Sequence, residues 1–160
     1  LSLLDDEGIS AEPLELIERV IERTIRLAPA IVELKAGGQI PDDPRFWDLL
    51  SDLPRLRSLD LTGSDAVHAL LLQLPDRIKT LNLSRCSWLD DNKFATICQK
   101  MPFLEKLTLA QNTQLTSKVW PHLRHFNQLK ALDLSGLRQI TEQDKKIIRS
   151  MLPGCLVNSL

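Results

Sequence analysis

A pattern of apolar and polar positions recurs along the chain at nearly regular intervals. Four segments follow the order apolar-x-x-Leu-x-Leu, and they cover residues 56–61, 78–83, 104–109 and 129–134; a weaker copy covers 31–36. The central leucines are Leu34, Leu59, Leu81, Leu107 and Leu132, which lie 25, 22, 26 and 25 residues apart. Because alternation of Leu with polar residues is typical of a short strand with one buried face, we expect one strand in each segment.

Segments with helix start signals lie between the predicted strands. Each begins with a capping residue before apolar residues at helical spacing, and these residues are Asp43, Asp65, Asp91 and Thr141. Thr141 with Asp144 resembles a capping box, with Asp in the place where Glu is usual. The segment after Thr116 is interrupted by Pro121, so only a short or irregular turn is expected there. Prolines precede the next strands at Pro54, Pro75 and Pro102, and they end each helix.

Strand, turn, helix and turn repeated about every 25 residues predict parallel strands on one side and helices on the other. The chain resembles the leucine-rich repeat family, in particular its cysteine-containing and ribonuclease-inhibitor-like types. Three repeats continue past the strand as that family does, through residues 86–90, 112–116 and 137–141. In the family, Cys or Asn opens this stretch and bonds to the backbone of the turn, as Cys86 and Asn112 would; Leu137, Ser64 and Gln39 depart from the pattern.

The resemblance covers roughly residues 30–157 and implies an α/β fold, a short leucine-rich-repeat solenoid with parallel strands on the concave side and helices on the convex side. We expect two regions: an acidic segment with an N-terminal capping helix over 1–29, and a repeat domain of about five repeats over 30–160. The capping helix is predicted over 10–28, from its broad apolar face. Residues 152–157 are similar to the truncated final strand that closes such arrays.

Composition and charge narrow the classes of function. Leucine accounts for 32 of the 160 residues, and the mix of 43% hydrophobic and 26% charged residues is typical of a globular domain. The net charge of −1 argues against a nucleic-acid or membrane partner, and no apolar run approaches the ~20 residues that span a bilayer. Three cysteines without CxxC spacing predict reduced thiols and a cytoplasmic, intracellular location.

The sequence lacks the common catalytic and phosphate-binding motifs, and we expect a non-enzyme without cofactor or metal. It has no glycine-rich phosphate loop, no HExxH and no GxSxG. His122 and His125 have the spacing of metal ligands but no third ligand near them in sequence, so a surface or packing pair is favoured. Cys98 lies on the apolar side of a predicted helix, which favours a buried, inert thiol over a reactive one.

The predicted function is protein–protein interaction through the concave face and adjoining loops. Residues between the leucines would face the concave side, and Trp88 lies in a turn where the equivalent residues are Gln114 and Gln139, which suggests an exposed interface anchor. The candidate partner-binding residues are Trp88, Lys35, Arg57, Asp60, Lys79, Asn82, Arg85, Lys106, Thr108, Lys130 and Asp133. A merely solvated surface is the alternative for the residues on and beside the strands, and for Trp88 the alternative is that its ring folds over its neighbour.

The size of the predicted sheet limits what it can bind alone. Five strands at ~4.8 Å spacing with about three residues each offer on the order of 250 Å², whereas a stable interface takes about 800 Å² from each partner. A partner would therefore also need the loops or another domain. Narrower possibilities are the substrate-recognition part of an F-box-type ubiquitin-ligase adaptor, a bacterial effector acting in a host cell, or an assembly segment. A monomer or a part of a larger chain is expected.

Overall fold

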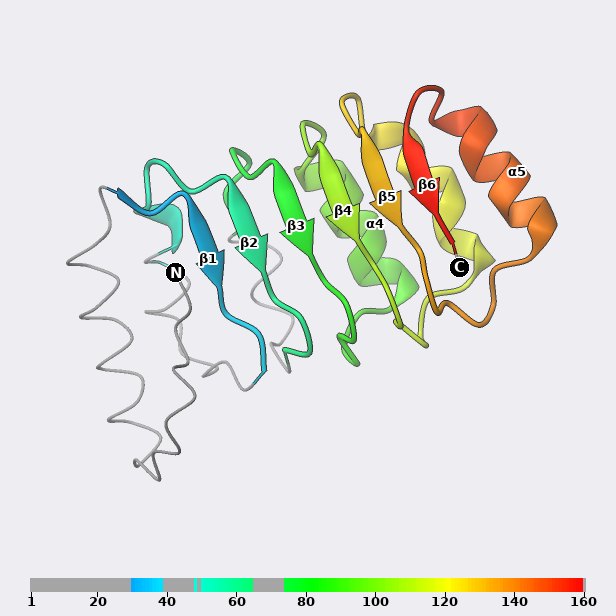
Figure 1. The fold of residues 1–160 in the computed structure, drawn as a ribbon, viewed down its shortest axis with the longest axis horizontal. Helices are drawn as coiled ribbons and strands as arrows, with labels where there is room; N and C mark the ends of the chain where they lie inside the picture. The colour runs from blue at the N-terminus through cyan, green and yellow to red at the C-terminus, as the bar shows by residue number, and fades with distance from the viewer. Residues whose placement is uncertain (1–29, 39–47, 49, 65–73, 160) are drawn as a thin grey trace.

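The computed structural model describes residues 30–38, 48, 50–64 and 74–159, which form an α/β fold around a parallel sheet (Figure 1). The sheet has six strands in chain order: β1 (Glu33–Lys35), β2 (Ser58–Asp60), β3 (Thr80–Asn82), β4 (Lys106–Thr108), β5 (Ala131–Asp133) and β6 (Leu156–Asn158). The five strands predicted from the leucine pattern are confirmed, and so is the final strand near residue 157. Each strand is only three residues long, so the fold depends on lateral pairing and on the packing behind the sheet.

One register runs across the whole sheet. Leu34 pairs with Leu59, and the pairing continues through Leu81, Leu107 and Leu132 to Val157. All five central leucines are buried. Because strand side chains alternate, the residues on both sides of each central leucine point to the opposite face of the sheet.

Three helical elements have both of their ends among the described residues: α4 (Asp91–Lys100), η2 (Ser117–His125) and α5 (Glu142–Met151). In the view of Figure 1, α4 lies behind the sheet and α5 lies beside β6 at the right-hand end. Neighbouring members contact each other, α4 with η2 and η2 with α5. The predicted helix near residue 91 is confirmed, but its cap is Asp90, whose side chain accepts a hydrogen bond from the Lys93 N–H at 2.9 Å. Asp91 instead accepts bonds from the Thr116 backbone and hydroxyl at 2.8 and 2.6 Å.

The two later helical elements differ in how well the sequence predicted them. Thr141 and Asp144 form the predicted capping box at the start of α5. The irregular turn expected after Thr116 is instead a 3₁₀ helix of nine residues with Pro121 inside it. In this helix Val119, Trp120 and Leu123 are buried, and their packing stabilises a conformation that is usually limited to a few residues.

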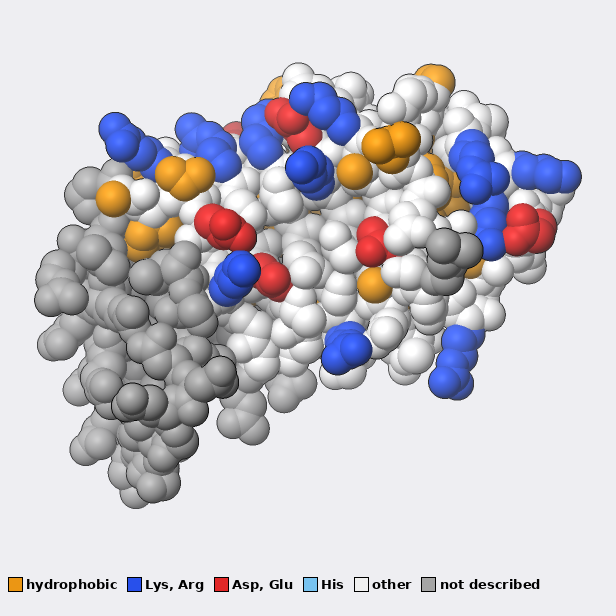
Figure 2. All heavy atoms as spheres, in the orientation of Figure 1, with side chains coloured by type: hydrophobic (Ala, Val, Ile, Leu, Met, Phe, Trp, Pro, Cys, Tyr) orange, Lys and Arg blue, Asp and Glu red, His pale blue; other side chains and the backbone are white. Residues whose placement is uncertain are grey.

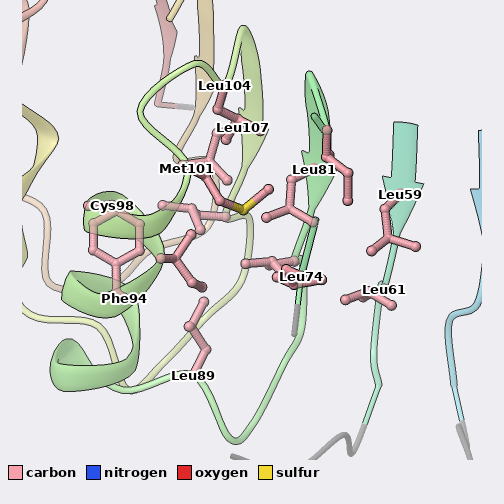
Figure 3. Close-up of a cluster of buried hydrophobic side chains, with 14 of the residues drawn as sticks. Leu59, Leu61, Leu74, Leu81, Leu89, Phe94, Cys98, Met101, Leu104 and Leu107 are labelled. Atoms are coloured by element: carbon pink, nitrogen blue, oxygen red, sulfur yellow. The ribbon is translucent and has the colours of Figure 1, made fainter. Parts of the chain in front are cut away.

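A single apolar core fills the space between the strands and the helices. Figure 3 shows part of it, where leucines of β2, β3 and β4 meet Phe94 and Cys98 of α4 together with Met101. The cluster runs without a break from Ile31 to Leu152. No single repeat encloses its own leucines, so the stability of each repeat depends on its neighbours.

In the turns after β3 and β4, Cys86 and Asn112 bond to backbone groups as predicted. The Asn112 side chain accepts a bond from the Cys86 N–H at 2.8 Å and donates to the carbonyls of Leu83 and Leu109 at 2.7 and 2.9 Å. Cys86 donates its thiol hydrogen to the Leu61 carbonyl at 3.3 Å. Of the helix predicted after Asp43, residues 48, 50 and 51 are described and are helical. The capping helix predicted over 10–28, the helix predicted after Asp65, and Gln39 lie outside the described residues.

Candidate partner-binding face

The exposed face of the sheet carries two rows of side chains, which come from the first and third positions of the strands. The first row is Glu33, Ser58, Thr80, Lys106 and Ala131, and the third-position row is Lys35, Asp60, Asn82, Thr108 and Asp133. The rows follow from the common register, because residues that pair across strands lie on the same face. The predicted face residues of the third position therefore lie together.

Several polar residues of this face already have structural partners. Asp60 Oδ1 accepts bonds from the backbone N–H of Thr62 at 2.9 Å and from its hydroxyl at 2.6 Å. The same arrangement joins Asn82 to Ser84 and Asp133 to Ser135. These side chains close the turn at the end of each strand, a role that the Asp-Leu-Thr, Asn-Leu-Ser and Asp-Leu-Ser spacing could have predicted. Their partner-binding role stays a prediction.

The other candidates on this face are more open to a partner. Lys35 and Lys106 are exposed, and Thr108 is half-buried. Thr108 is followed two positions later by Ala110, which has no side-chain hydroxyl to repeat the turn bond made by Asp60. Lys106 and Thr108 belong to β4, near the middle of the sheet. They are therefore the positions at which a substitution disturbs the fold least.

Trp88 is less exposed than the sequence suggested. Its ring packs against the core, it is half-buried, and its indole N–H donates to Ser64 Oγ at 3.4 Å. The equivalent residues Gln114 and Gln139 are exposed, as predicted. The ring folds onto a residue of the preceding repeat, as in the second of the two interpretations of this position, and it is not a fully exposed anchor. Whether its outer edge contacts a partner stays a prediction.

The basic candidates divide between two edges of the sheet. Arg57, Lys79 and Lys130 immediately precede β2, β3 and β5, at the edge where the strands begin. Arg85 lies at the other edge, in a left-handed conformation (φ 57°), and donates from Nε to Gln111 Oε1 at 2.7 Å. The structure thus groups Arg57, Lys79 and Lys130 and separates Arg85 from them.

Two exposed apolar side chains were missed by the sequence analysis at the edge where the strands begin. Phe103 is 46% exposed and Val32 is 51% exposed. Phe103 stands four residues before a central leucine, where the equivalent residues are Arg55, Arg77 and Gln128. Comparison of this position across the repeats would have identified Phe103 as exposed, because polar residues at the equivalent positions indicate contact with solvent.

The titratable side chains considered for chemistry have ordinary structural surroundings. Burial raises the pKa of the Cys86 and Cys98 thiols, and it also raises the pKa of the half-buried Cys155. A thiolate is therefore disfavoured at all three cysteines. His122 and His125 stack with ring centroids 6.4 Å apart, as residues three apart do in a 3₁₀ helix. Within the described part of the chain, no three His, Cys, Asp or Glu side chains gather as metal ligands would.

Comparison with known proteins gives similarity in structure alone. No family model matches the chain, and no curated protein matches it. A chain in a structure of Chaetomium Mex67:Mtr2 subunits is similar with a TM-score of 0.53 and 17% identity over 89% of this chain and 88% of that one. The leucine-rich repeat-containing protein LegL7 from Legionella pneumophila is similar with a TM-score of 0.50 and 17% identity.

The alignment with LegL7 covers 94% of this chain and 62% of that protein's chain. None of the helices in the described ranges is both long and apolar enough to cross a membrane. At these identities the likeness concerns the fold and not the activity. The chain therefore has an α/β fold with a six-stranded parallel sheet, similar in structure to a leucine-rich repeat-containing protein.

Proposed function

We propose that this chain is a non-enzymatic leucine-rich-repeat solenoid that binds a protein partner through the exposed sheet face and the adjoining turns. The observation that carries the proposal is the common register of the central leucines of β1 to β5, which continues to Val157 in β6. That register places the intervening side chains in continuous rows on a face that no described helix covers (Figure 1). The structural likeness to a leucine-rich repeat-containing protein supports the same assignment.

The chemistry of the face favours recognition over catalysis. The carboxylates of Asp60 and Asp133 accept bonds that close turns, which opposes their use as a catalytic acid or base. The face mixes Lys35 and Lys106 with hydroxyl and amide groups, and such mixed polarity suits the rim and core of a protein interface. The three cysteines are free thiols, which supports a reducing, cytoplasmic setting.

Partner capture with variants of β4 tests the proposal. Lys106→Glu and Thr108→Arg change the charge or size of the face without removing a turn bond, so both should retain the thermal midpoint and lose a captured protein. Lys146→Glu is the matched control, because Lys146 is an exposed lysine of α5, away from the sheet. If the β4 variants capture the same proteins as the control, the face is not the binding surface.

The identity of the captured protein distinguishes the narrower possibilities. A ubiquitin-ligase scaffold would support the adaptor function, and a host-cell protein captured by a bacterial chain would support the effector function. Quantitative mass spectrometry of the material captured by the wild type and by Lys106→Glu would identify it.

A further inference from the structure

The two edges of the sheet differ in charge. The turns before β2 to β5 cover residues 54–57, 76–79, 102–105 and 127–130, and they contain five basic and two acidic residues. The turns after β2 to β5, over 61–64, 83–86, 109–112 and 134–137, contain one basic residue, Arg85, and no acidic one. Figure 2 shows Lys and Arg side chains gathered along the top edge, where the strands begin. This edge is positive in a chain whose net charge is −1.

Two arginines among the five basic residues donate to backbone carbonyls. Arg57 does so within its own turn, from one guanidinium nitrogen to the carbonyls of Leu56 at 3.0 Å and Pro54 at 3.3 Å. Arg77 donates from its guanidinium to the carbonyls of Leu50, Ser51 and Leu53 at 2.7 to 3.1 Å, at the end of a helical segment. A cation at that position satisfies carbonyls which have no partner within the helix. The four basic residues other than Arg77, together with the exposed Asp76 and Phe103 and the half-buried Glu105, form what we call the basic rim: Arg55, Arg57, Asp76, Lys79, Phe103, Glu105 and Lys130.

Lys79 and Phe103 together form the centre of the basic rim. Lys79 Nζ lies 5.6 Å from the Phe103 ring centroid and donates to the Phe103 carbonyl at 3.1 Å. It also donates to Gln128 Oε1 at 3.4 Å. The ammonium group is thus held beside an aromatic ring that is 46% exposed. A cation next to an exposed ring offers both charge and apolar area to one ligand.

Glu105 occupies the position that an acidic ligand would take. Its carboxylate accepts a bond from Lys130 Nζ at 2.6 Å and lies 3.9 Å from Lys79 Nζ. The Lys130 side chain is 70% exposed. The hydrogen bond from Lys130 keeps the pKa of Glu105 below its ordinary value, so Glu105 is charged at neutral pH. Such exposed ion pairs contribute little to stability, and a second carboxylate can therefore replace Glu105 at low cost.

We propose that the basic rim binds an extended acidic peptide that carries an aromatic side chain. The proposal rests on the proposed function only in taking the partner to be a protein. From β2 to β5 the rim spans about 14 Å at the ordinary strand spacing, and an extended peptide covers this length with four to five residues at about 3.3 Å each. Carboxylates would bind Arg57, Lys79 and Lys130, and the aromatic side chain would pack on Phe103.

The order of charges along the basic rim favours a peptide over a nucleic acid. Arg57 comes first, then Asp76 and Lys79, then Glu105 beside Phe103, and then Lys130. A nucleic acid carries a phosphate on every nucleotide, so one of its charges would face Glu105. A peptide can place an uncharged aromatic residue at that point. Acidic partners of this kind are steered to a positive edge, and their affinity falls with rising salt.

Fluorescence anisotropy with a labelled synthetic peptide tests the proposal. The probe has twelve residues, Asp and Glu with one central Trp, and the comparison probes replace Trp by Ala or every acid by its amide. The double variant Lys79→Glu, Lys130→Glu should bind at least about tenfold more weakly, since two attractive pairs become repulsive. Glu105→Gln should bind about two- to fivefold more tightly, because it removes the competing carboxylate.

A matched pair on α5 controls for charge alone. Glu142 and Lys145 form an exposed ion pair of the same kind, 2.7 Å apart, so Glu142→Gln changes the net charge as Glu105→Gln does. Equal gains in Glu105→Gln and Glu142→Gln would overturn the proposal. The proposal would also be overturned if a twelve-nucleotide oligouridylate bound more tightly than the acidic peptide. The same holds if the peptide in which Ala replaces Trp bound with unchanged affinity.

The experiments distinguish failure of the basic rim proposal from failure of the sheet-face proposal. If the peptide does not bind while Lys106→Glu still prevents partner capture, the basic rim proposal is wrong and the face proposal stands. If the peptide binds as described but the β4 variants capture normally, the basic rim is the recognition surface and the sheet face is not.

Discussion

Asn112 shows how a single polar side chain is used in the core. It is 1% exposed, yet it makes three hydrogen bonds to backbone groups of two successive turns. An amide supplies both a donor and an acceptor, which is why one residue can serve an N–H and two carbonyls together. The same position in other repeats holds Ser64, Cys86 and Leu137, so the bonding of the turns differs between repeats.

Asn112→Leu is expected to lower the free energy of unfolding by about 3 kcal/mol or more. Leucine is similar in size but leaves the Cys86 N–H and the carbonyls of Leu83 and Leu109 buried without the side-chain partner, and each such group costs about 1–3 kcal/mol. Urea denaturation measures the change. Gln114→Leu in the same turn is the control, because Gln114 is exposed and its replacement should stay within about 0.5 kcal/mol. Equal effects of the two variants would contradict this account of Asn112.

At the scale of elements, the N-terminal end of α5 depends on reciprocal hydrogen bonds between Thr141 and Asp144. Asp144 accepts bonds from the Thr141 backbone N–H at 2.8 Å and from its hydroxyl at 2.6 Å. In return, the Asp144 N–H donates to Thr141 Oγ1 at 3.1 Å. Two of the helix's N-terminal groups are satisfied in this way, and the negative charge lies at the favourable end of the helix dipole.

The capping box makes part of the stability dependent on pH. The hydroxyl and N–H bonds from Thr141 lower the pKa of Asp144 in the folded state. The unfolded carboxyl has a pKa of about 3.9, so the stabilisation is complete above that value and is lost as the pH falls through the folded pKa. Asp144→Asn should therefore cost about 1 kcal/mol at pH 7, and the difference from the wild type should shrink as the pH falls below about 3.9.

Thermal denaturation from pH 7 to pH 2 measures this difference. Glu142→Gln is the control in the same turn: its carboxylate is 80% exposed and its ion pair with Lys145 is screened by solvent, so its effect should be small at every pH. A difference between wild type and Asp144→Asn that stays constant down to pH 2 would show that the charge of Asp144 does not contribute.

For the molecule as a whole, the sequence predicted the features that follow from a repeating local pattern, above all the positions of the strands. The strands around Leu34, Leu59, Leu81, Leu107 and Leu132 could be predicted because period-two alternation and the 25-residue repeat agree on the same positions. For Trp88 the sequence left two environments open, because the contact that decides between them is made with Ser64, 24 residues earlier. The nine-residue η2 was also missed, since the packing of Trp120 and Leu123 outweighs the local effect of Pro121.

The candidate site was predicted in part. The third-position row follows from register, but sequence reasoning treated Asp60 and Asp133 as available to a partner although they close turns. It also placed Arg57 and Arg85 in one group, whereas the strand direction separates them to opposite edges. Both differences come from the geometry of the strand ends, which the leucine pattern does not describe.

β6 provides the last test, because it is the outermost strand of the described sheet and covers the backbone of β5. The Leu156 N–H donates to the Lys130 carbonyl at 2.8 Å, and the Leu134 N–H donates to the Asn158 carbonyl at 2.7 Å. Val157 pairs with Leu132 and packs on the core, whereas Leu156 is 78% exposed. Alternation along one short strand thus supplies a test position and its own control.

Val157→Lys is expected to lower the free energy of unfolding by about 1–3 kcal/mol and to detach β6, because it brings a charge to the apolar side of the strand. The amide of Leu134 should then exchange its hydrogen faster with solvent, and the uncovered edge of β5 should promote self-association. Hydrogen exchange and sedimentation measure these effects. Leu156→Lys should change neither, since Leu156 faces solvent. If Leu156→Lys instead destabilises as much as Val157→Lys, β6 does not pack on the core through Val157.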